Sequence, residues 1–286
     1  MRLSLACALL AWPLAALAHG AAFGETGHAP VWIAQVLFVV AWCSYTLGAI
    51  QRRPTARGRA AFHAAMLIGG IALFGPFDDL AGASTAWHMA QHMLLIVVVA
   101  PLLVAARPMA QWRTCFGARS DPLWRGATRL SRHVGACAVL HAAAIWGWHL
   151  PGPYMAAVMH TGLHVLEHAS FLLTGVWFWW AVLRAGRGGS LAAAMALLFT
   201  LMHTGFLGAL LTFAKEPLYW RESRELIDQQ LAGLVMWVPG GAAYVAAIVW
   251  VVARMLAGGA PDATTAVSSS LGSATDRRDA LSSLRG

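Results

Sequence analysis

The chain has 286 residues, of which 59% are hydrophobic and only 11% are charged, and its mean hydropathy is +0.61. A soluble domain usually carries about 25% charged residues, so this composition excludes an ordinary soluble domain and indicates a membrane protein. The net charge of +8 comes mostly from arginines in short loops between apolar segments, and Lys215 is the single lysine. Because the arginines are spread over these loops, they fit membrane topology better than binding to nucleic acid.

The first 20 residues read MRLSLACALLAWPLAALAHG. Arg2 is followed by an apolar stretch and then by Ala16-Leu17-Ala18, which is the order of a secretory signal peptide with an A-x-A cleavage site. We expect cleavage after Ala18, which would leave His19 as the first residue of the mature chain, outside the cytoplasm. An uncleaved eighth helix is the alternative.

Seven apolar segments follow, each near the ~20 residues that a helix needs to cross the hydrocarbon core. Their hydrophobicity is continuous rather than alternating, so it predicts helices. Pro101 lies inside the third segment and is expected to kink it. We place the segments at 31–50, 61–77, 85–106, 134–150, 162–183, 190–213 and 231–256.

The predicted fold class is therefore all-α: a polytopic transmembrane helical bundle of seven helices after a cleavable signal peptide. The predicted domains are the signal peptide over 1–18, the transmembrane domain over 19–256 and a cytoplasmic tail over 257–286. The tail is rich in Ser, Ala, Thr and Gly, a composition that favours disorder.

The arginines also predict the orientation of the bundle. If seven helices alternate, the arginine-rich loops after the first, third and fifth helices fall on one side, which the positive-inside rule makes cytoplasmic. The N-terminus is then outside and the C-terminus inside, in agreement with the signal peptide. We expect a multi-pass protein of the bacterial inner membrane, in contact with lipid.

Histidines gather near the outer ends of the third and fifth predicted helices. His88 and His92 are four residues apart in WHMAQHM, and His164 and His168 are four apart in HTGLHVLEH. Residues at this spacing share a helix face, so the two pairs can face each other at similar depth. His160 extends the second stripe by a turn if the helix begins that early.

Two further residues complete the predicted metal site. Glu167 follows His164 by three residues and can be a ligand or can orient one. His203 lies nearer the midplane on the sixth helix. Imidazole suits copper, zinc and iron, and nearby methionines such as Met89 and Met93 favour Cu(I) as auxiliary ligands. The predicted metal residues are therefore His88, His92, His160, His164, Glu167, His168 and His203.

The blocks WHMAQHMLLIVVVAPLLVAARP, WHLPGPYMAAVMHTGLHVLEHASFLLTGVWFW and LMHTGFLGALLTF resemble the CtaG family of cytochrome c oxidase assembly factors. The resemblance covers roughly 30–256 and implies a polytopic membrane protein that helps to assemble the oxidase by supplying copper. We expect no enzymatic activity. Its implied partners are oxidase subunits and periplasmic copper chaperones, and its polar signature falls on His88, His92, His164, Glu167, His168 and His203.

Two alternatives stay open. HVLEH also matches the H-x-x-E-H motif of metalloproteases, in which two histidines bind zinc and the glutamate is the general base. An intramembrane zinc protease would need a third ligand, for which His88, His92 or His203 could serve. The other alternative is a haem b electron carrier with axial histidines from different helices. The sequence does not separate copper from zinc or haem.

Overall fold

The computed structural model describes residues 29–219 and 225–257, and within these ranges it contains helices and no strands. The predicted all-α class is confirmed. The predicted signal peptide, His19 and residues 258–286 of the predicted tail lie outside the described residues. In chain order the elements are α2 (Ala29–Gln51), α3 (Ala56–Phe74), α4 (Pro76–Ala83), α5 (Thr85–Met93), η1 (Leu94–Val99), α6 (Ala100–Ala106), α7 (Met109–Phe116), η2 (Ala118–Ser120), α8 (Asp121–Leu130), α9 (Val134–His149), α10 (Pro151–Met159), α11 (Thr161–Leu183), η3 (Arg187–Gly189), α12 (Ser190–Thr212) and α13 (Leu226–Ala257).

Most of these elements correspond to the predicted transmembrane segments. The fourth predicted segment, 134–150, forms the shorter apolar helix α9, whose 16 residues rise about 24 Å. The multi-pass membrane character is confirmed, whereas a count of seven crossings stays a prediction. In the described part of the chain, six helical stretches are long and apolar enough to cross a membrane: Ala29–Gln51, Ala56–Ala83, Thr85–Ala106, Thr161–Leu183, Ser190–Thr212 and Leu226–Ala257.

The long helices turn apolar side chains outward and several polar ones inward. Leu37 of α2 and Leu191 of α12 are 62% and 64% exposed, whereas Gln91 and His92 of α5 are fully buried. Such large apolar exposure is unfavourable in water but suits contact with lipid chains. Polar groups inside a membrane bundle are costly and usually functional, so the buried side of α5 is the place to look for a site.

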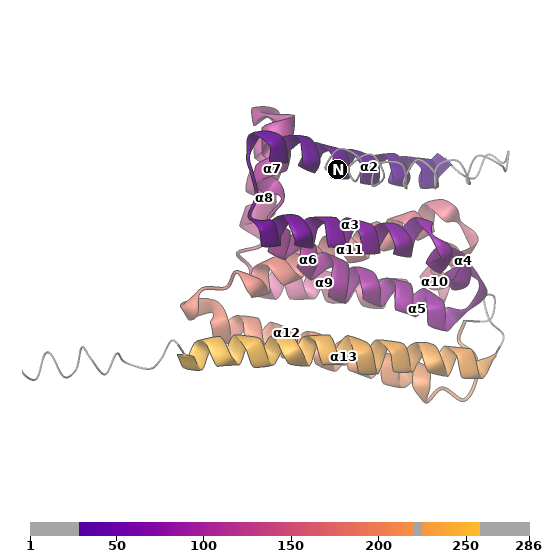
Figure 1. Ribbon diagram of the computed structural model, residues 1–286. Coiled ribbons are helices and arrows are strands. Elements are labelled where there is room, and N and C mark those ends of the chain that lie inside the picture. The colour runs from indigo at the N-terminus through magenta and orange to yellow at the C-terminus, as the bar shows by residue number, and fades with distance from the viewer. Residues whose placement is uncertain (1–28, 220–224, 258–286) are drawn as a thin grey trace, which may run out of the picture.

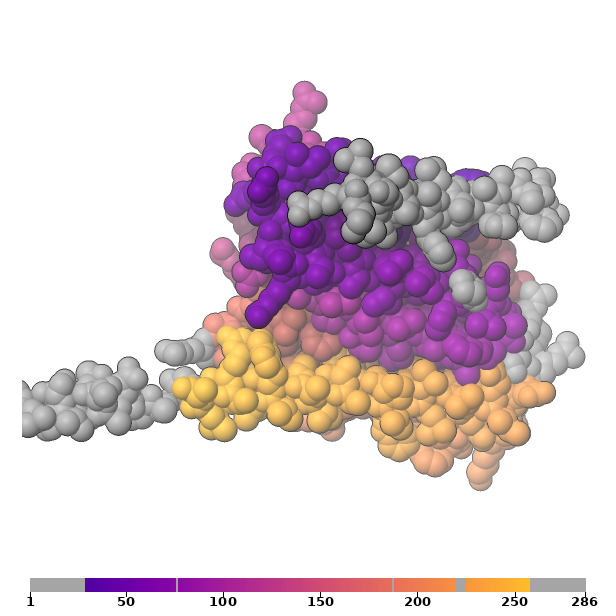
Figure 2. All heavy atoms as spheres, viewed as in Figure 1, coloured from indigo at the N-terminus to yellow at the C-terminus, as the bar shows by residue number. Residues whose placement is uncertain are grey.

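Figure 1 shows the long helices running side by side between two ends of the bundle. One end, on the left, carries α7 and α8 with their arginines, among them Arg113 and Arg125. The other end carries α4, α10 and the start of α5. We call these the arginine end and the histidine end. In the filled view, the orange-to-yellow surface of α13 lies directly below the purple surface of the preceding helices (Figure 2).

Helices α12 and α13 pack closely against each other. A Cβ atom built on Gly233 of α13 would lie only 2.5 Å from the carbonyl oxygen of Gly208 in α12. Both positions therefore require glycine, because any larger residue would push the two backbones apart. Small residues are the usual means by which membrane helices approach closely. This pairing fixes α13, which in turn packs on α5.

The third span is not a uniform α-helix. Residues Leu94–Val99 form a π-helix that ends two residues before Pro101, the position of the predicted kink. Proline has no amide hydrogen, so it leaves a carbonyl of the preceding turn without its usual donor. The Ile96 carbonyl oxygen instead accepts a hydrogen bond of 2.8 Å from the Trp179 indole in α11. The π-helix begins two residues after His92. Because π-helical turns often occur at functional sites, this position favours a site at His92.

Candidate metal centre

Helix α5 is fixed at its first turn by a carboxylate from α13. Asp228 accepts hydrogen bonds of 2.6 Å from the Ser84 hydroxyl and of 2.6 Å from the Thr85 backbone amide. These contacts satisfy a donor that the start of a helix leaves open. Because the last helix holds the first turn of α5 in this way, the side chains that follow are placed relative to the whole bundle.

A second set of contacts to α5 is made by Gln91. Its amide donates to the Ala72 carbonyl oxygen of α3 at 2.7 Å and to the Asp78 carboxylate of α4 at 3.1 Å. Gln91 lies about 60–100° around the helix axis from His88 and His92, so that when its amide is directed toward α3 and α4 the two imidazoles point toward α11. The helix period that the sequence suggested therefore sets the direction of both imidazoles.

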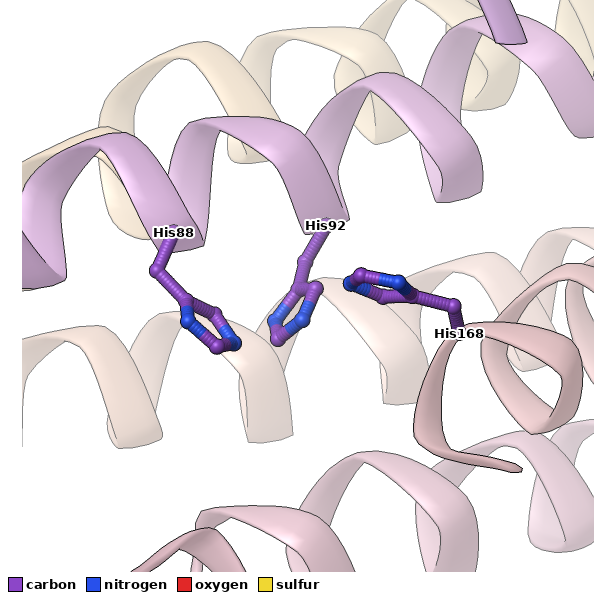
Figure 3. Close-up of side chains that lie close together, drawn as sticks. All are labelled: His88, His92 and His168. Atoms are coloured by element: carbon purple, nitrogen blue, oxygen red, sulfur yellow. The ribbon is translucent and has the colours of Figure 1, made fainter. Parts of the chain in front are cut away.

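His88 and His92 meet His168 across the space between α5 and α11. Figure 3 shows two rings descending from one helix toward a third ring that projects from another. The ring centroids of His88 and His92 are 4.4 Å apart, and those of His92 and His168 are 5.2 Å apart. One nitrogen from each of the three rings lies within 4.8 Å of the others, so a single metal ion can reach all three. The predicted facing of the two histidine pairs is thus present in the structure.

The remaining residues of HVLEH join the same group. The His164 ring centroid lies 4.2 Å from that of His168 and 5.2 Å from that of His88. Oε2 of Glu167 lies 3.7 Å from Nε2 of His88, and Oε1 lies 3.8 Å from Nε2 of His92. His88, His164 and Glu167 form a second set whose ligand atoms are within reach of one ion. We call His88, His92, His164, Glu167 and His168 the histidine cluster.

Burial increases along the helix that carries HTGLHVLEH. His160 is exposed, His164 is half-buried and His168 is 8% exposed, while His88 and His92 across from them are at 1% and 0%. An ion could therefore enter at the end near His160 and reach dry ligands within two helical turns. Such a gradient gives the cluster one open side and one closed side.

Three ring nitrogens of His92 and His168 form no hydrogen bond with another described residue. Nδ1 and Nε2 of His92, and Nε2 of His168, have no hydrogen-bond partner among the described residues. A neutral imidazole carries one N–H donor and one lone pair, and burying either without a partner costs about 1–3 kcal/mol. Coordination of a metal ion would use these lone pairs, so the donor set fits a metal that prefers imidazole, such as copper or zinc.

Another buried histidine lies beside the histidine cluster. His149 ends α9, and its ring centroid is 6.2 Å from that of His92. Its Nδ1 is 2.7 Å from the Ile145 carbonyl oxygen, and its Nε2 is 3.2 Å from the Met89 sulfur. His149 lies near the end of the predicted segment 134–150, and it is not among the predicted metal residues. The signal available was its neighbourhood, since WHLP ends a helix at the depth of the predicted site.

Two predicted residues lie outside both sets of candidate ligands. His160 stands at the position before α11, which begins at Thr161, and it is exposed. His203 in α12 accepts a hydrogen bond of 3.3 Å at Nδ1 from the Trp146 indole, and its ring lies against Phe199. Neither belongs to the groups of residues whose ligand atoms converge in the described chain.

The family described as "Cytochrome c oxidase caa3 assembly factor" matches residues 36–257, which include every helix that contributes to the histidine cluster. No curated protein and no solved structure matches the chain.

Proposed function

This chain belongs to the family of cytochrome c oxidase caa3 assembly factors, and we propose that it binds copper at the histidine cluster and delivers it to the oxidase. The observation that carries the proposal is the convergence of four imidazoles and one carboxylate in the interior of the bundle. Histidines are rare in membrane segments, and so many at one depth are costly unless they serve a function. Copper is the cargo in this account, and no chemical conversion of it is required.

The charge balance of the histidine cluster supports a monovalent ion. Four neutral imidazoles with an ionised Glu167 carry one negative charge in a site where Glu167 is only 1% exposed. A buried charge is costly unless an opposite charge compensates it. One Cu(I) ion would bring the total to zero, whereas a divalent ion would leave an excess of one positive charge.

Release to a partner requires that the ion be reachable from one side. The half-buried His164 and the exposed His160 provide that side. We propose that the histidine end faces outward, because the arginines of α7 and α8 mark the opposite end and positive residues favour the cytoplasm. An oxidase subunit or a periplasmic copper chaperone would then dock near the start of α11.

The two alternatives predict different properties of the purified protein. A haem b carrier would show a Soret band, which copper or zinc loading does not produce. A zinc protease would cleave peptides and would lose this activity in a Glu167→Gln variant. In the structure the two Glu167 oxygens face His88 and His92. The carboxylate is therefore placed to bind the ion or to orient its ligands, and this position does not require that it act as a general base.

The proposal is tested by the copper content of the oxidase that cells assemble. In a strain whose own gene is replaced by the His92→Ala/His168→Ala variant, we expect the oxidase to accumulate with less copper and lower activity. The matched control is His133→Ala, which removes an exposed imidazole at the arginine end. A fully copper-loaded oxidase in the double-variant strain would contradict the proposal.

A further inference from the structure

In the contact between Met89 and His149, the thioether sulfur and Nε2 meet without a hydrogen atom between them. His149 is 5% exposed and Met89 is fully buried. Nδ1 of His149 lies 2.7 Å from the Ile145 carbonyl oxygen, which can only accept a hydrogen bond. Nδ1 must therefore carry the N–H, and the proton position is assigned from this bond. In the neutral ring Nε2 is then a bare lone pair.

That lone pair is directed at a thioether. The Met89 sulfur, 3.2 Å from Nε2, also offers only lone pairs, so the contact is not an N–H···S hydrogen bond. Protonating Nε2 would make a charged imidazolium in a dry environment, which is costly. Two electron-pair donors held this close are the arrangement that a cation would bridge. Ligands at roughly 2.0 Å (nitrogen) and 2.3 Å (sulfur) from one ion are at most about 4.3 Å apart, so this pair is within range.

We propose that Met89 Sδ and His149 Nε2 form a Cu(I) subsite at the closed side of the histidine cluster. The proposal rests on the function proposed above and deepens it by adding a sulfur ligand and a second position for the Cu(I) ion. Thioether sulfur favours Cu(I), whereas zinc sites use cysteine, histidine and carboxylate ligands. The subsite would therefore retain Cu(I) and give no comparable advantage to Zn(II).

His92 connects the subsite to the rest of the cluster. Its ring centroid lies 6.2 Å from that of His149 and 5.2 Å from that of His168. Neither of its ring nitrogens has a hydrogen-bond partner in the ranges that the structure describes, so both are available to an ion on either side. An ion entering past His164 would exchange imidazole ligands at His168 and His92 before it meets the thioether.

The position of His149 is itself fixed from outside the membrane helices. The Tyr219 hydroxyl donates a hydrogen bond of 2.6 Å to the His149 backbone carbonyl, and the Tyr219 ring stacks on Tyr154 at a centroid distance of 3.8 Å. The Met89 side is held within an apolar core that includes Phe171 and Met236. Both donor atoms are thus supported before any ion arrives, as a built site requires.

The test is X-ray absorption at the copper edge on the full-length protein loaded with Cu(I) under reducing conditions. We expect a sulfur contribution in the wild type that disappears in Met89→Leu, a substitution that nearly conserves volume and leaves the fold intact. Met66→Leu is the matched control, because Met66 is a buried methionine of a separate core cluster. Zn(II) affinity should be the same in wild type and Met89→Leu.

The outcomes separate this inference from the proposed function. Bound Cu(I) with only nitrogen and oxygen neighbours in the wild type would overturn the subsite and leave copper binding by the histidine cluster standing. Sulfur that persists in Met89→Leu would overturn the assignment to Met89. A wild-type protein that binds no Cu(I) would overturn both proposals.

Discussion

His92 and Glu167 lie on different helices and place Nε2 and Oε1 3.8 Å apart in the interior of the bundle. The distance is too long for a hydrogen bond and short enough for both atoms to bind one ion. Glu167 stands at a similar distance, 3.7 Å, from His88. The carboxylate is therefore centred on the two histidines of α5, and its role can be tested separately from theirs.

The first prediction concerns the charge of this carboxylate. Glu167→Gln keeps the shape of the side chain but removes its negative charge. Because the cation then loses its compensating charge, we expect Cu(I) affinity of the purified protein to fall about 10–100-fold. Competition with a Cu(I) chelator measures this change. Glu216→Gln, at an exposed position of the loop after α12, should bind Cu(I) as the wild type does.

A second prediction addresses the anchor of α5. Asp228→Asn retains one acceptor oxygen where Asp228 now accepts from both the Ser84 hydroxyl and the Thr85 amide. Loss of such a cap costs about 0.5–2 kcal/mol, so the melting temperature in detergent should fall. Asp79→Asn alters an exposed carboxylate near the same end and serves as the control. Equal melting temperatures for the two variants would show that the cap does not hold α5.

The sequence alone predicts how the two histidine pairs are placed. Four-residue spacing places His88 with His92 and His164 with His168 on single helix faces, and the arginine pattern brings both pairs to one end. The structure adds that Gln91 and Asp228 orient α5, which no local pattern reveals. The predicted bounds of the apolar segments are also close to the bounds of the helices, because continuous hydrophobicity is a strong signal.

Other parts of the site depend on packing that spacing does not encode. His149 reaches Met89 because α9 ends beside α5, and a lone histidine in a sequence carries no sign of this. His203 was expected to join the metal residues, but its helix turns it toward Trp146. His160 is exposed because α11 begins one residue after it. The predicted cleavage after Ala18 and the cytoplasmic tail stay predictions.

The π-helix after His92 gives a third prediction. Trp179→Phe removes the indole donor that bonds the Ile96 carbonyl, and leaves a buried acceptor unsatisfied next to Pro101. We expect a loss of about 1–3 kcal/mol in the free energy of unfolding. Trp177→Phe, which changes a partly buried indole of the same helix, should cost less. A larger loss at Trp177 than at Trp179 would argue against this role of the indole.

A fourth prediction links pH to the support of His149. Burial, together with the negative charge of Glu167, raises the pKa of Tyr219 above its ordinary value of 10. A group whose pKa is higher in the folded state stabilises the fold below its unfolded pKa, and that contribution is lost as the pH rises beyond it. Tyr219→Phe removes the hydrogen bond to the His149 carbonyl oxygen. The variant should therefore be less stable than the wild type by about 1 kcal/mol at neutral pH.

Above pH 10 the difference between Tyr219→Phe and the wild type should shrink, because only the wild type retains a tyrosine that must be kept protonated at this position. Chemical unfolding in detergent at a series of pH values measures both stabilities. A stability difference that stays constant from neutral pH to well above pH 10 would contradict the assignment.

Copper content tests the central claim most directly. The protein would be purified, loaded with Cu(I), freed of unbound metal and analysed for copper per chain, alongside a variant in which His88, His92, His164 and His168 are all alanine. The exposed His133→Ala variant is the control. We predict that wild type and control retain copper and that the fourfold variant does not. Equal copper in all three proteins would show that the histidine cluster is not the copper site.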